Sequence, residues 1–312
     1  MLFSFVIIGY NEEKNASGCI DSILALNGLR DYEVLFVNDG STDSTAEIVN
    51  RISAGDTSVK LVDVMENRGR GYARYLGVEV AQGKYIVFVD ADIRLPANWL
   101  KKCLEYMSTY DAVGGIAVPD GDVAYVHRRF GLKPKKVAHT TEITGNNCLF
   151  KADILKKHNY DPNLREGEDV DLSLRLRREK IRMHTVPGLF VEHREHKTFT
   201  QSVKWLYECG WGATRQLFRF RFIRLADYAF FGFLFLIALC VSEFVLSGTA
   251  GSFLLLLLYP LLTSFLHLRS KFETEWRRID LFFFAVLANY ILIWAYYLGR
   301  VAGLPRLLGK SA

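Results

Sequence analysis

The sequence predicts an α/β domain built on a mostly parallel sheet with helices on both faces, followed by a helical transmembrane region. Over the first 120 residues, short apolar runs alternate with amphipathic segments, an order typical of such sheets. From Tyr228 onward, long apolar runs are separated only by short basic loops, as in membrane-spanning helices. We therefore expect a soluble domain over residues 1–198, an amphipathic interfacial segment over 199–226 and a transmembrane region of about three helices over 227–312.

Composition and charge disfavour several classes of protein. The chain is 50% apolar and 23% charged, and the long apolar runs of its second part disfavour a purely soluble enzyme. A fully embedded transporter is equally disfavoured, because roughly the first 200 residues hold no apolar stretch near the 18 to 20 needed to span a bilayer. The net charge is +5, with a basic cluster directly before the first long apolar run. That cluster consists of Arg215, Arg219, Arg221 and Arg224. Because aromatic and aliphatic residues interleave with it, the cluster fits anionic lipid headgroups better than nucleic acid.

The cysteines and the N-terminal residues indicate the cellular compartment of the soluble domain. Five cysteines are scattered without a CxxC pair, so neither a disulfide framework nor a zinc site is predicted. The apolar run Leu2–Ile8 is too short for a secretory signal and reads as a buried strand. We therefore expect the soluble domain to be cytoplasmic.

The predicted elements of the sheet follow from periodicity and turn signals. The expected strands are Leu2–Ile8, Glu33–Val37, Lys60–Val64 and Tyr85–Val89. The expected helices lie near Ser17–Leu26, after a capping box formed by Ser44 and Glu47, and over Tyr72–Gln82.

Polar and acidic residues directly follow three of these strands. They are Tyr10, Asn11 and Glu12 after the first strand, Asn38–Asp43 after the second, and Asp90, Ala91 and Asp92 after the fourth. Each group alone could be a turn with helix caps. Because ligands of parallel sheets bind outside the carboxyl ends of the strands, their joint placement favours a binding site.

The two carboxylates of Asp90 and Asp92 suit a hard divalent cation such as Mg²⁺ or Mn²⁺, which takes substrate phosphates as further ligands. A nucleoside diphosphate is the natural partner. The sequence holds no GxxxxGK[ST] motif and no GxGxxG after the first strand, which disfavours ATPase and dinucleotide-cofactor functions. The Gly-rich loop Asn67–Gly71 could cradle a phosphate or be a flexible turn.

Two later segments have both a functional and a structural interpretation. The run Gly167–Asp171 opens an amphipathic helix, where acidic residues can serve catalysis or simply favour the helix dipole. His184, His193 and His196 follow in a basic stretch, and a lone histidine is more often structural than a ligand.

Four motifs in this order resemble those of family 2 glycosyltransferases of the GT-A fold, including dolichyl-phosphate sugar synthases and transferases of lipid-linked glycans. They are Val6–Glu13, Asn38–Asp43, Phe88–Asp92 and Gly167–Leu172, and the resemblance spans about the first 200 residues.

The resemblance implies roles for particular residues. Tyr10, Glu12, Val37 and Asp39 would line the nucleoside pocket, Asp90 and Ala91 would lie beside the ribose and sugar, Asp92 would ligate the metal, and Asp169 would be the catalytic base. His193 falls where many relatives place a metal-ligating histidine, with His196 as the competitor.

This sequence departs from the family pattern at two points. Gly9 replaces the usual proline before Tyr10, which we expect to loosen the loop. No QxxRW motif follows the acidic helix, which disfavours processive polysaccharide synthesis.

The implied function is inverting transfer of a sugar from a UDP- or GDP-linked donor to a hydroxyl of a lipid-linked or membrane-proximal acceptor. The alternatives are a polyprenyl-phosphate sugar synthase, whose anionic acceptor needs no base, and a non-catalytic nucleotide-sugar-binding membrane scaffold.

The C-terminal region gives a mixed topological signal. Three candidate spans are Tyr228–Leu246, Ser252–Leu268 and Leu281–Leu298. Basic loops on the catalytic side agree with the positive-inside rule for the first two, and predict a multi-pass protein of the cell membrane. A third span, which we favour because it is as apolar as the others, would place Arg300, Arg306 and Lys310 outside, against the same rule.

Overall fold

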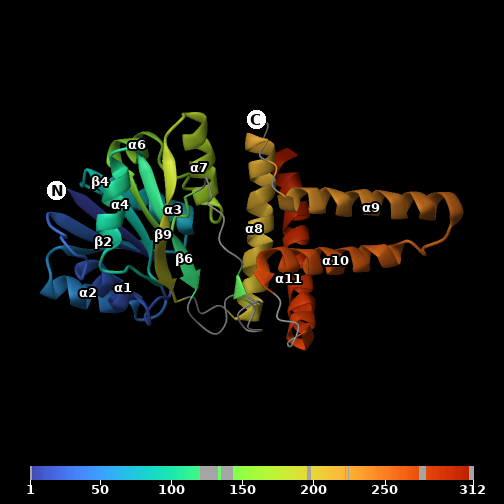
Figure 1. Cartoon of the computed structure of the whole chain (residues 1–312), viewed down its shortest axis with the longest axis horizontal. Coiled ribbons are helices and arrows are strands. Elements are labelled where there is room, and N and C mark those ends of the chain that lie inside the picture. Colours follow the sequence, from blue (N-terminus) through green and yellow to red (C-terminus); the bar gives the residue numbers. More distant parts are fainter. Residues whose placement is uncertain are drawn as a thin grey trace. The chain divides into compact units, whose positions relative to one another are not determined.

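The computed structural model describes residues 2–119, 133–134, 143–194, 198–221, 223, 225–273 and 279–308. The chain forms two compact units, one of Met1–Gly121 with Ala138–Glu195 and the other of Asp122–Val137 with His196–Ala312 (Figure 1).

The first unit is a mixed eight-stranded sheet covered by helices, which confirms the predicted α/β class. The strand order is β3-β2-β1-β4-β8-β6-β9-β5. The strands are β1 (Phe3–Gly9), β2 (Tyr32–Asp39), β3 (Val59–Val64), β4 (Tyr85–Asp90), β5 (Ile93–Arg94), β6 (Ala112–Pro119), β8 (Asn147–Lys151) and β9 (Met183–His193). The helices are α1 (Ala16–Leu24), α2 (Thr45–Gly55), α3 (Arg70–Val80), α4 (Trp99–Met107), α6 (Ala152–Lys157) and α7 (Glu168–Arg178).

The four predicted strands form one parallel part of the sheet, and β6 and β9 form a second parallel pair. β2 and β4 pair with β1, and β3 pairs with β2, all in parallel. β8 then pairs antiparallel with β4 and β6. Strand β1 reads as a continuous apolar run because both of its faces are covered: Phe5 and Ile7 belong to one core cluster, and Val6 and Ile8 to the other. The carboxyl ends of β1, β2 and β4 therefore meet at one edge.

The predicted capping box of α2 is absent. Ser44 is the N-cap residue, but its side chain makes no cap hydrogen bond. Instead the Asp43 carboxylate accepts the backbone N–H of Thr45 at 3.0 Å and its hydroxyl at 2.5 Å. An ionised carboxylate is the stronger acceptor, so it replaces the expected serine.

Gly9 is explained by packing at the end of β1. A Cβ atom there would lie 2.9 Å from the Phe36 ring and 3.1 Å from the Ala91 Cβ. The glycine lets the strand end pack tightly on its neighbours, and the expected loosening is not what the structure shows.

The second unit is helical. It holds α8 (Phe199–Phe220), α9 (Leu225–Ser247), α10 (Phe253–Lys271) and α11 (Ile279–Leu308), with β7 (Lys133–Pro134) paired antiparallel to β10 (Phe272–Glu273). Among the described residues, 226–247 in α9 and 282–304 in α11 are long and apolar enough to cross a membrane. The apolar part of α10, residues 253–269, is shorter and contains Pro260.

Gly40, directly after β2, tests how tightly the strand-end loops fit. Its φ is +70°, and a Cβ atom there would lie 2.5 Å from the backbone nitrogen of Asn67. Gly28 has a similar φ of +76° but open space around it. We expect Gly28→Ala to lower the free energy of unfolding by about 1 kcal/mol from the backbone conformation alone. Gly40→Ala should cost about 2 kcal/mol or more because the clash adds to it. Chemical denaturation of both variants measures this, and equal losses would contradict the tight fit.

Candidate active site

The loops after β1 and β2 are tied together by side chains. Asn11 has a φ of +58°, a conformation that asparagine tolerates better than most residues. Its backbone N–H donates to the Ser41 hydroxyl at 2.9 Å, and its side-chain oxygen accepts the Thr42 N–H at 2.8 Å. The Glu12 N–H donates to the Thr45 hydroxyl at 2.8 Å. These bonds fix one edge of the site before any ligand binds.

Carboxylates crowd this edge. Burial, and next the charges of Asp92 and Asp90, together raise the pKa of Glu12 to about 7, against a hydrogen bond from Asn15. Such repulsion is relieved when a cation binds among the carboxylates. The geometry thus favours a positively charged ligand beside Asp92.

Asp39 holds the Gly-rich loop in place. Its carboxylate accepts the backbone N–H groups of Arg68 at 2.9 Å and Gly69 at 2.8 Å. The Gly71 N–H donates to the Leu164 carbonyl at 3.0 Å. The loop is therefore neither a flexible turn nor an open phosphate cradle, since these three donors are already used. Burial raises the pKa of Asp39, and the two N–H groups oppose the rise.

Arg74 in α3 is the buried centre of the site. Its side chain is 2% exposed, contacts the Asp90 carboxylate at 2.6 Å and forms an ion pair with Glu168. Burial favours the neutral form of Arg74, but the charges of Asp90 and Glu168 outweigh it and raise its pKa above the ordinary value. One permanent cation therefore joins the end of β4 to the start of α7.

The sequence interpretation missed Arg74, which it included in a plain amphipathic helix. The signal was present, because Arg74 lies on the same face of α3 as the buried Gly77 and Val78. An arginine on an apolar helix face needs a buried carboxylate partner.

The acidic start of α7 presents two unlike carboxylates. Glu168 is buried, and burial raises its pKa while the Arg74 guanidinium opposes the rise. Asp169 is partly exposed, and its carboxylate accepts the N–H groups of Gly145 at 3.3 Å and Val170 at 2.8 Å. An ion pair between Arg70 and Glu166, 3.1 Å long, supports the same segment. Of the adjacent Glu168 and Asp169 carboxylates, Asp169 is the one that reaches solvent.

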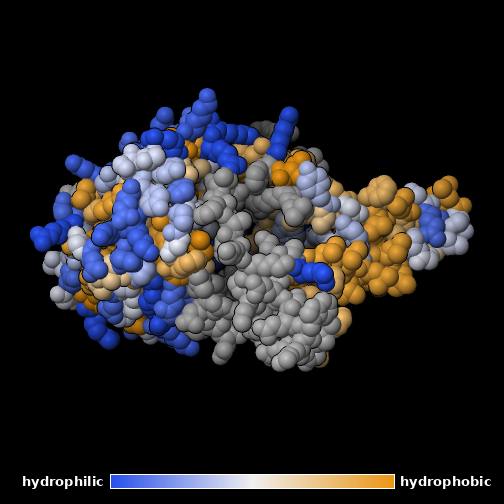
Figure 2. Space-filling view, in the orientation of Figure 1, coloured by the Kyte–Doolittle hydropathy of each residue, from blue (hydrophilic) through white to orange (hydrophobic). Residues whose placement is uncertain are grey.

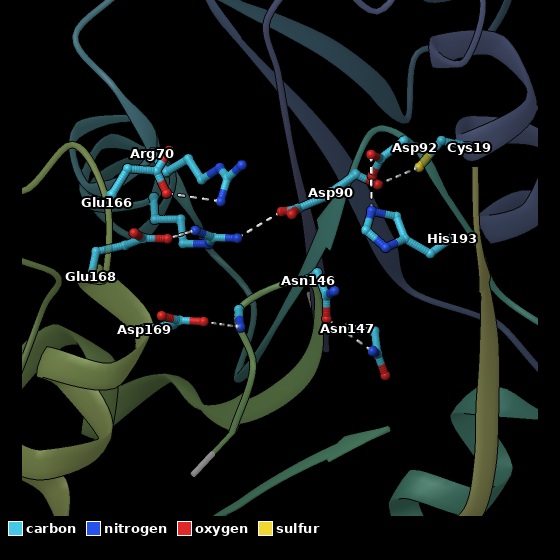
Figure 3. Close-up of polar contacts among 12 residues, drawn as sticks. Cys19, Arg70, Asp90, Asp92, Asn146, Asn147, Glu166, Glu168, Asp169 and His193 are labelled. Carbon is cyan, nitrogen blue, oxygen red and sulfur yellow. Dashed lines mark hydrogen bonds and ion pairs between the residues drawn. The ribbon is translucent and has the colours of Figure 1, made fainter. Parts of the chain in front are cut away.

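Asp92 and His193 form the candidate metal pair. The Nε2 atom of His193 lies 3.0 Å from Oδ2 of Asp92, and both side chains are partly exposed (Figure 3). Pairing of Ile93 with His193 in the sheet, and a 2.7 Å bond from the Arg194 N–H to the Asp92 carbonyl, bring β5, which closely follows β4 in the chain, together with β9 here. The competing histidine, His196, lies outside the described residues.

These two ligands fit a partly open cation site. Within the part of the chain that the structure describes, no group of three or more His, Cys, Asp or Glu side chains could hold a metal ion. An oxygen and an imidazole nitrogen suit Mg²⁺ or Mn²⁺ when substrate phosphates and water complete the shell.

The other expected site residues differ in position. Tyr10 is 46% exposed at the end of β1 and is open to a ligand. Val37 has no exposed surface and Ala91 only 1%, because both side chains pack in the core clusters. Only their backbone atoms are left to face a ligand, and their expected places beside the nucleoside and the sugar stay predictions. His184 stacks on Tyr110 with ring centroids 4.5 Å apart, a structural role.

Comparison with known proteins assigns the first unit to a family. Residues 4–158 match the model of glycosyl transferase family 2. The chain is 28% identical over 182 residues to poly(ribitol-phosphate) beta-glucosyltransferase of Bacillus spizizenii, covering 54% of this chain and 28% of that protein. It is 28% identical over 219 residues to glycosyltransferase EpsJ of Bacillus subtilis, covering 64% and 63%. The chain thus spans less than two thirds of the length of the curated relatives it matches.

Solved transferases share the fold. The mannosyltransferase PcManGT from Pyrobaculum calidifontis, in complex with GDP-Man and Mn²⁺, superposes with a TM-score of 0.60 at 18% identity, covering 91% of this chain and 85% of that one. S. aureus TarS 1–349 in complex with UDP-GlcNAc gives 0.51 at 16% identity, covering 98% and 92%. The expected GT-A fold is confirmed.

The buried ion pairs of Arg74 generate a stability prediction. Arg74→Met leaves Asp90 and Glu168 without their cation, and should lower the free energy of unfolding by about 3 to 5 kcal/mol. Adding Glu168→Gln removes one orphaned charge and should recover part of that loss. Arg182→Met is the matched control, since Arg182 is 59% exposed and pairs with Asp111 at 3.3 Å. The control should cost less than about 1 kcal/mol. Denaturation curves that gave Arg74→Met and Arg182→Met the same small loss would contradict a structural role for Arg74.

Proposed function

Because the chain belongs to glycosyl transferase family 2 through its first unit, we propose that it transfers a sugar from a nucleoside diphosphate to a hydroxyl group of a membrane-proximal acceptor. One observation carries this proposal: the Asp92–His193 pair and the partly exposed Asp169 both border the strand-end edge, and Arg74 links that edge to α7 through Asp90 and Glu168. The Asp92–His193 pair would bind the donor diphosphate, and Asp169 would face the acceptor.

On the donor side, exposed Tyr10 would stack on the nucleobase, and Glu12 and Asp39 would border the nucleoside. Asp90, held by Arg74, would lie beside the ribose and sugar. Asp92 and His193 would hold Mg²⁺ or Mn²⁺, which supplies Lewis-acid stabilisation of the departing diphosphate. The GDP-Man and UDP-GlcNAc in the structural neighbours support a GDP- or UDP-linked donor.

On the acceptor side, Asp169 would act as the general base. The acceptor oxygen attacks the anomeric carbon while the bond from that carbon to the diphosphate oxygen breaks. The hydroxyl proton passes to the Asp169 carboxylate, and the nucleoside diphosphate leaves. A single in-line displacement inverts the anomeric centre. Glu168 is a poorer candidate because it is buried against Arg74.

The acceptor and the location follow from the second unit. Long apolar helices support a membrane-associated enzyme with its catalytic domain, residues 1–198, on the cytoplasmic side, an interfacial segment over 199–226 and a membrane region over 227–312. A lipid-linked or cell-envelope acceptor suits this arrangement. Two relatives are named a poly(ribitol-phosphate) beta-glucosyltransferase and a teichoic acid poly(glycerol phosphate) polymerase, which supports such an acceptor.

The first test is Asp92→Asn. The amide cannot replace the anionic ligand, so metal-dependent turnover should fall on the order of 100-fold or more, with the thermal unfolding temperature unchanged. Donor hydrolysis or sugar transfer with Mn²⁺ over a panel of UDP- and GDP-sugars measures it. Asp153→Asn, at an exposed position of α6, is the control and should keep full activity. Near-normal turnover in Asp92→Asn would rule out the metal role.

The second test is Asp169→Asn, which should separate chemistry from binding. Transfer to a hydroxyl acceptor should fall about 100-fold or more, while the dissociation constant for the donor stays within a few-fold. Calorimetric titration with donor and initial-rate kinetics provide the two measurements. If donor affinity collapses with the rate, Asp169 belongs to the donor site. Unimpaired transfer to a polyprenyl phosphate would favour the sugar synthase alternative, which needs no base.

A further inference from the structure

Helices α9 and α10 expose apolar side chains toward the turn that joins them, and in α9 these side chains lie around the whole circumference. The exposed residues are Tyr228, Phe231, Phe235, Leu239, Val241, Phe244, Val245 and Leu246 in α9, and Phe253, Leu254, Leu255, Leu257, Leu258, Leu262 and Leu266 in α10. Figure 2 shows this surface as a continuous apolar arm with a more polar tip. A helix that is apolar on all sides and not covered by protein requires hydrocarbon around it.

The arm has the dimensions of a bilayer. At 1.5 Å per residue, the 23 residues of α9 extend about 34 Å, close to the roughly 30 Å of a hydrocarbon core. At the tip, the Glu243 carboxylate accepts the Thr249 hydroxyl at 2.8 Å and the Ser252 N–H at 3.2 Å. The turn is thus polar and internally hydrogen-bonded, as a turn that emerges into water should be.

Helix α11 crosses the opposite end of this hairpin. Its first part packs on the end of α10: the Phe282 ring lies 5.6 Å from that of Phe265, and the Ser264 hydroxyl donates to the Val286 carbonyl at 2.7 Å. Its later part packs on the beginning of α9, where the Tyr297 ring lies 4.9 Å from that of Phe233. In Figure 1, α11 runs across the direction of α9 and α10.

A buried ion pair fixes this crossing. Nη1 of Arg300 lies 2.5 Å from Oδ1 of Asp227, and both side chains are at most 2% exposed. If α11 were a third span, Arg300 would lie 21 residues beyond Ile279, about 30 Å across the bilayer from the first turn of α9. Asp227 is in that first turn. The two residues cannot be in contact and on opposite sides, so the ion pair excludes the three-span arrangement.

Helix α8 packs closely along α11. A Cβ atom at Gly299 would lie 1.9 Å from the Tyr207 carbonyl oxygen, and one at Gly210 would lie 2.1 Å from that of Tyr296. The two backbones therefore touch along several turns. Charged residues along α8, namely Lys204, Glu208, Arg215 and Arg219, prevent it from spanning a membrane. Helix α11, which packs along α8, therefore lies at the same depth relative to the membrane.

The exposed apolar residues of α11 agree with a surface position. They are Phe283, Phe284, Leu287, Ile291, Leu298 and Val301. At 100° per residue they fall on a single stripe of the helix. The other faces of α11 pack against α8, α9 and α10, so this stripe is the one apolar surface that α11 leaves open, as a helix in the plane of the interface does toward the acyl chains.

We propose that only the α9–α10 hairpin crosses the bilayer, and that α8 and α11 lie paired on the membrane surface at the side of the catalytic domain. The proposal rests on the membrane association proposed above. It replaces the expected three spans with two. The C-terminal residues Arg306 and Lys310 then remain on the catalytic side, and the positive-inside rule is satisfied by every basic segment.

Cysteine accessibility in sealed vesicles of both orientations tests this topology. The full chain, with its five cysteines replaced by alanine, receives one cysteine at a time: M65C marks the catalytic domain, A250C the hairpin turn, and S311C the C-terminal tail. Met65 and Ala250 are exposed, and Ser311 lies outside the described residues. We expect an impermeant maleimide to label M65C and S311C from the same face, and A250C only from the opposite face.

Two results would overturn the proposal: labelling of S311C from the face opposite to M65C, as three spans require, or labelling of A250C from the same face as M65C. Vesicle flotation and donor turnover are measured in parallel. Failure to float overturns both membrane association and the hairpin, whereas loss of turnover alone speaks against the proposed enzyme and not against the topology.

A charge exchange tests the ion pair in the membrane-bound protein. R300D should lower the unfolding temperature in detergent and make the S311C label position heterogeneous, because two carboxylates then face each other. The double variant D227R/R300D restores an opposite pair and should recover both properties. A double variant that is no better than R300D would show that Asp227 and Arg300 are apart, contradicting the crossing.

Discussion

The buried guanidinium of Arg74 is the constraint on which the first unit depends. A charge removed from water must be compensated in place, so α3, the end of β4 and the start of α7 can pack only where Asp90 and Glu168 both reach Arg74. This pins Asp90 at the edge of the sheet and aligns α7, which leaves the neighbouring Asp169 partly exposed. The geometry of the proposed catalytic site and the stability of the fold therefore rest on the same contact.

Beside this buried cation, the edge of the sheet gathers the carboxylates of Glu12, Asp90 and Asp92. Burial, and next the charges of Asp92 and Asp90, raise the pKa of Glu12 to about 7. In the second unit, by contrast, the charges of Arg300 and Asp227 compensate each other in a buried ion pair. Buried ion pairs serve architecture in both units, and the gathered carboxylates of the sheet edge mark the place where we propose that a cation binds.

The sequence was informative where a pattern is local. Strand ends followed from apolar runs, and the joint placement of Glu12, Asp39 and Asp92 followed from parallel topology. Asp43 replacing Ser44 as the capping acceptor could not be predicted, because both residue types cap helices and only the loop geometry selects one. The burial of Val37 and Ala91 was hidden as well, since a motif gives order along the chain and not the direction of a side chain. Apolar length alone likewise predicts a span in α11, whereas the long-range contact of Arg300 with Asp227, on which the two-span proposal rests, has no sequence periodicity.

The glycines of the strand-end loops have an evolutionary consequence. Gly40, Gly69 and Gly71 face backbone atoms of other loops, those of Asn67, Arg165 and Leu164. A side chain can adopt another rotamer to admit a methyl group, but a backbone cannot. Replacement of any one of these three glycines alone is therefore not tolerated. Such a replacement requires a simultaneous change in the length or path of the opposing loop. The loops at this edge should accordingly diverge between homologues as a set, whereas turns such as that of Gly28 are free to change alone.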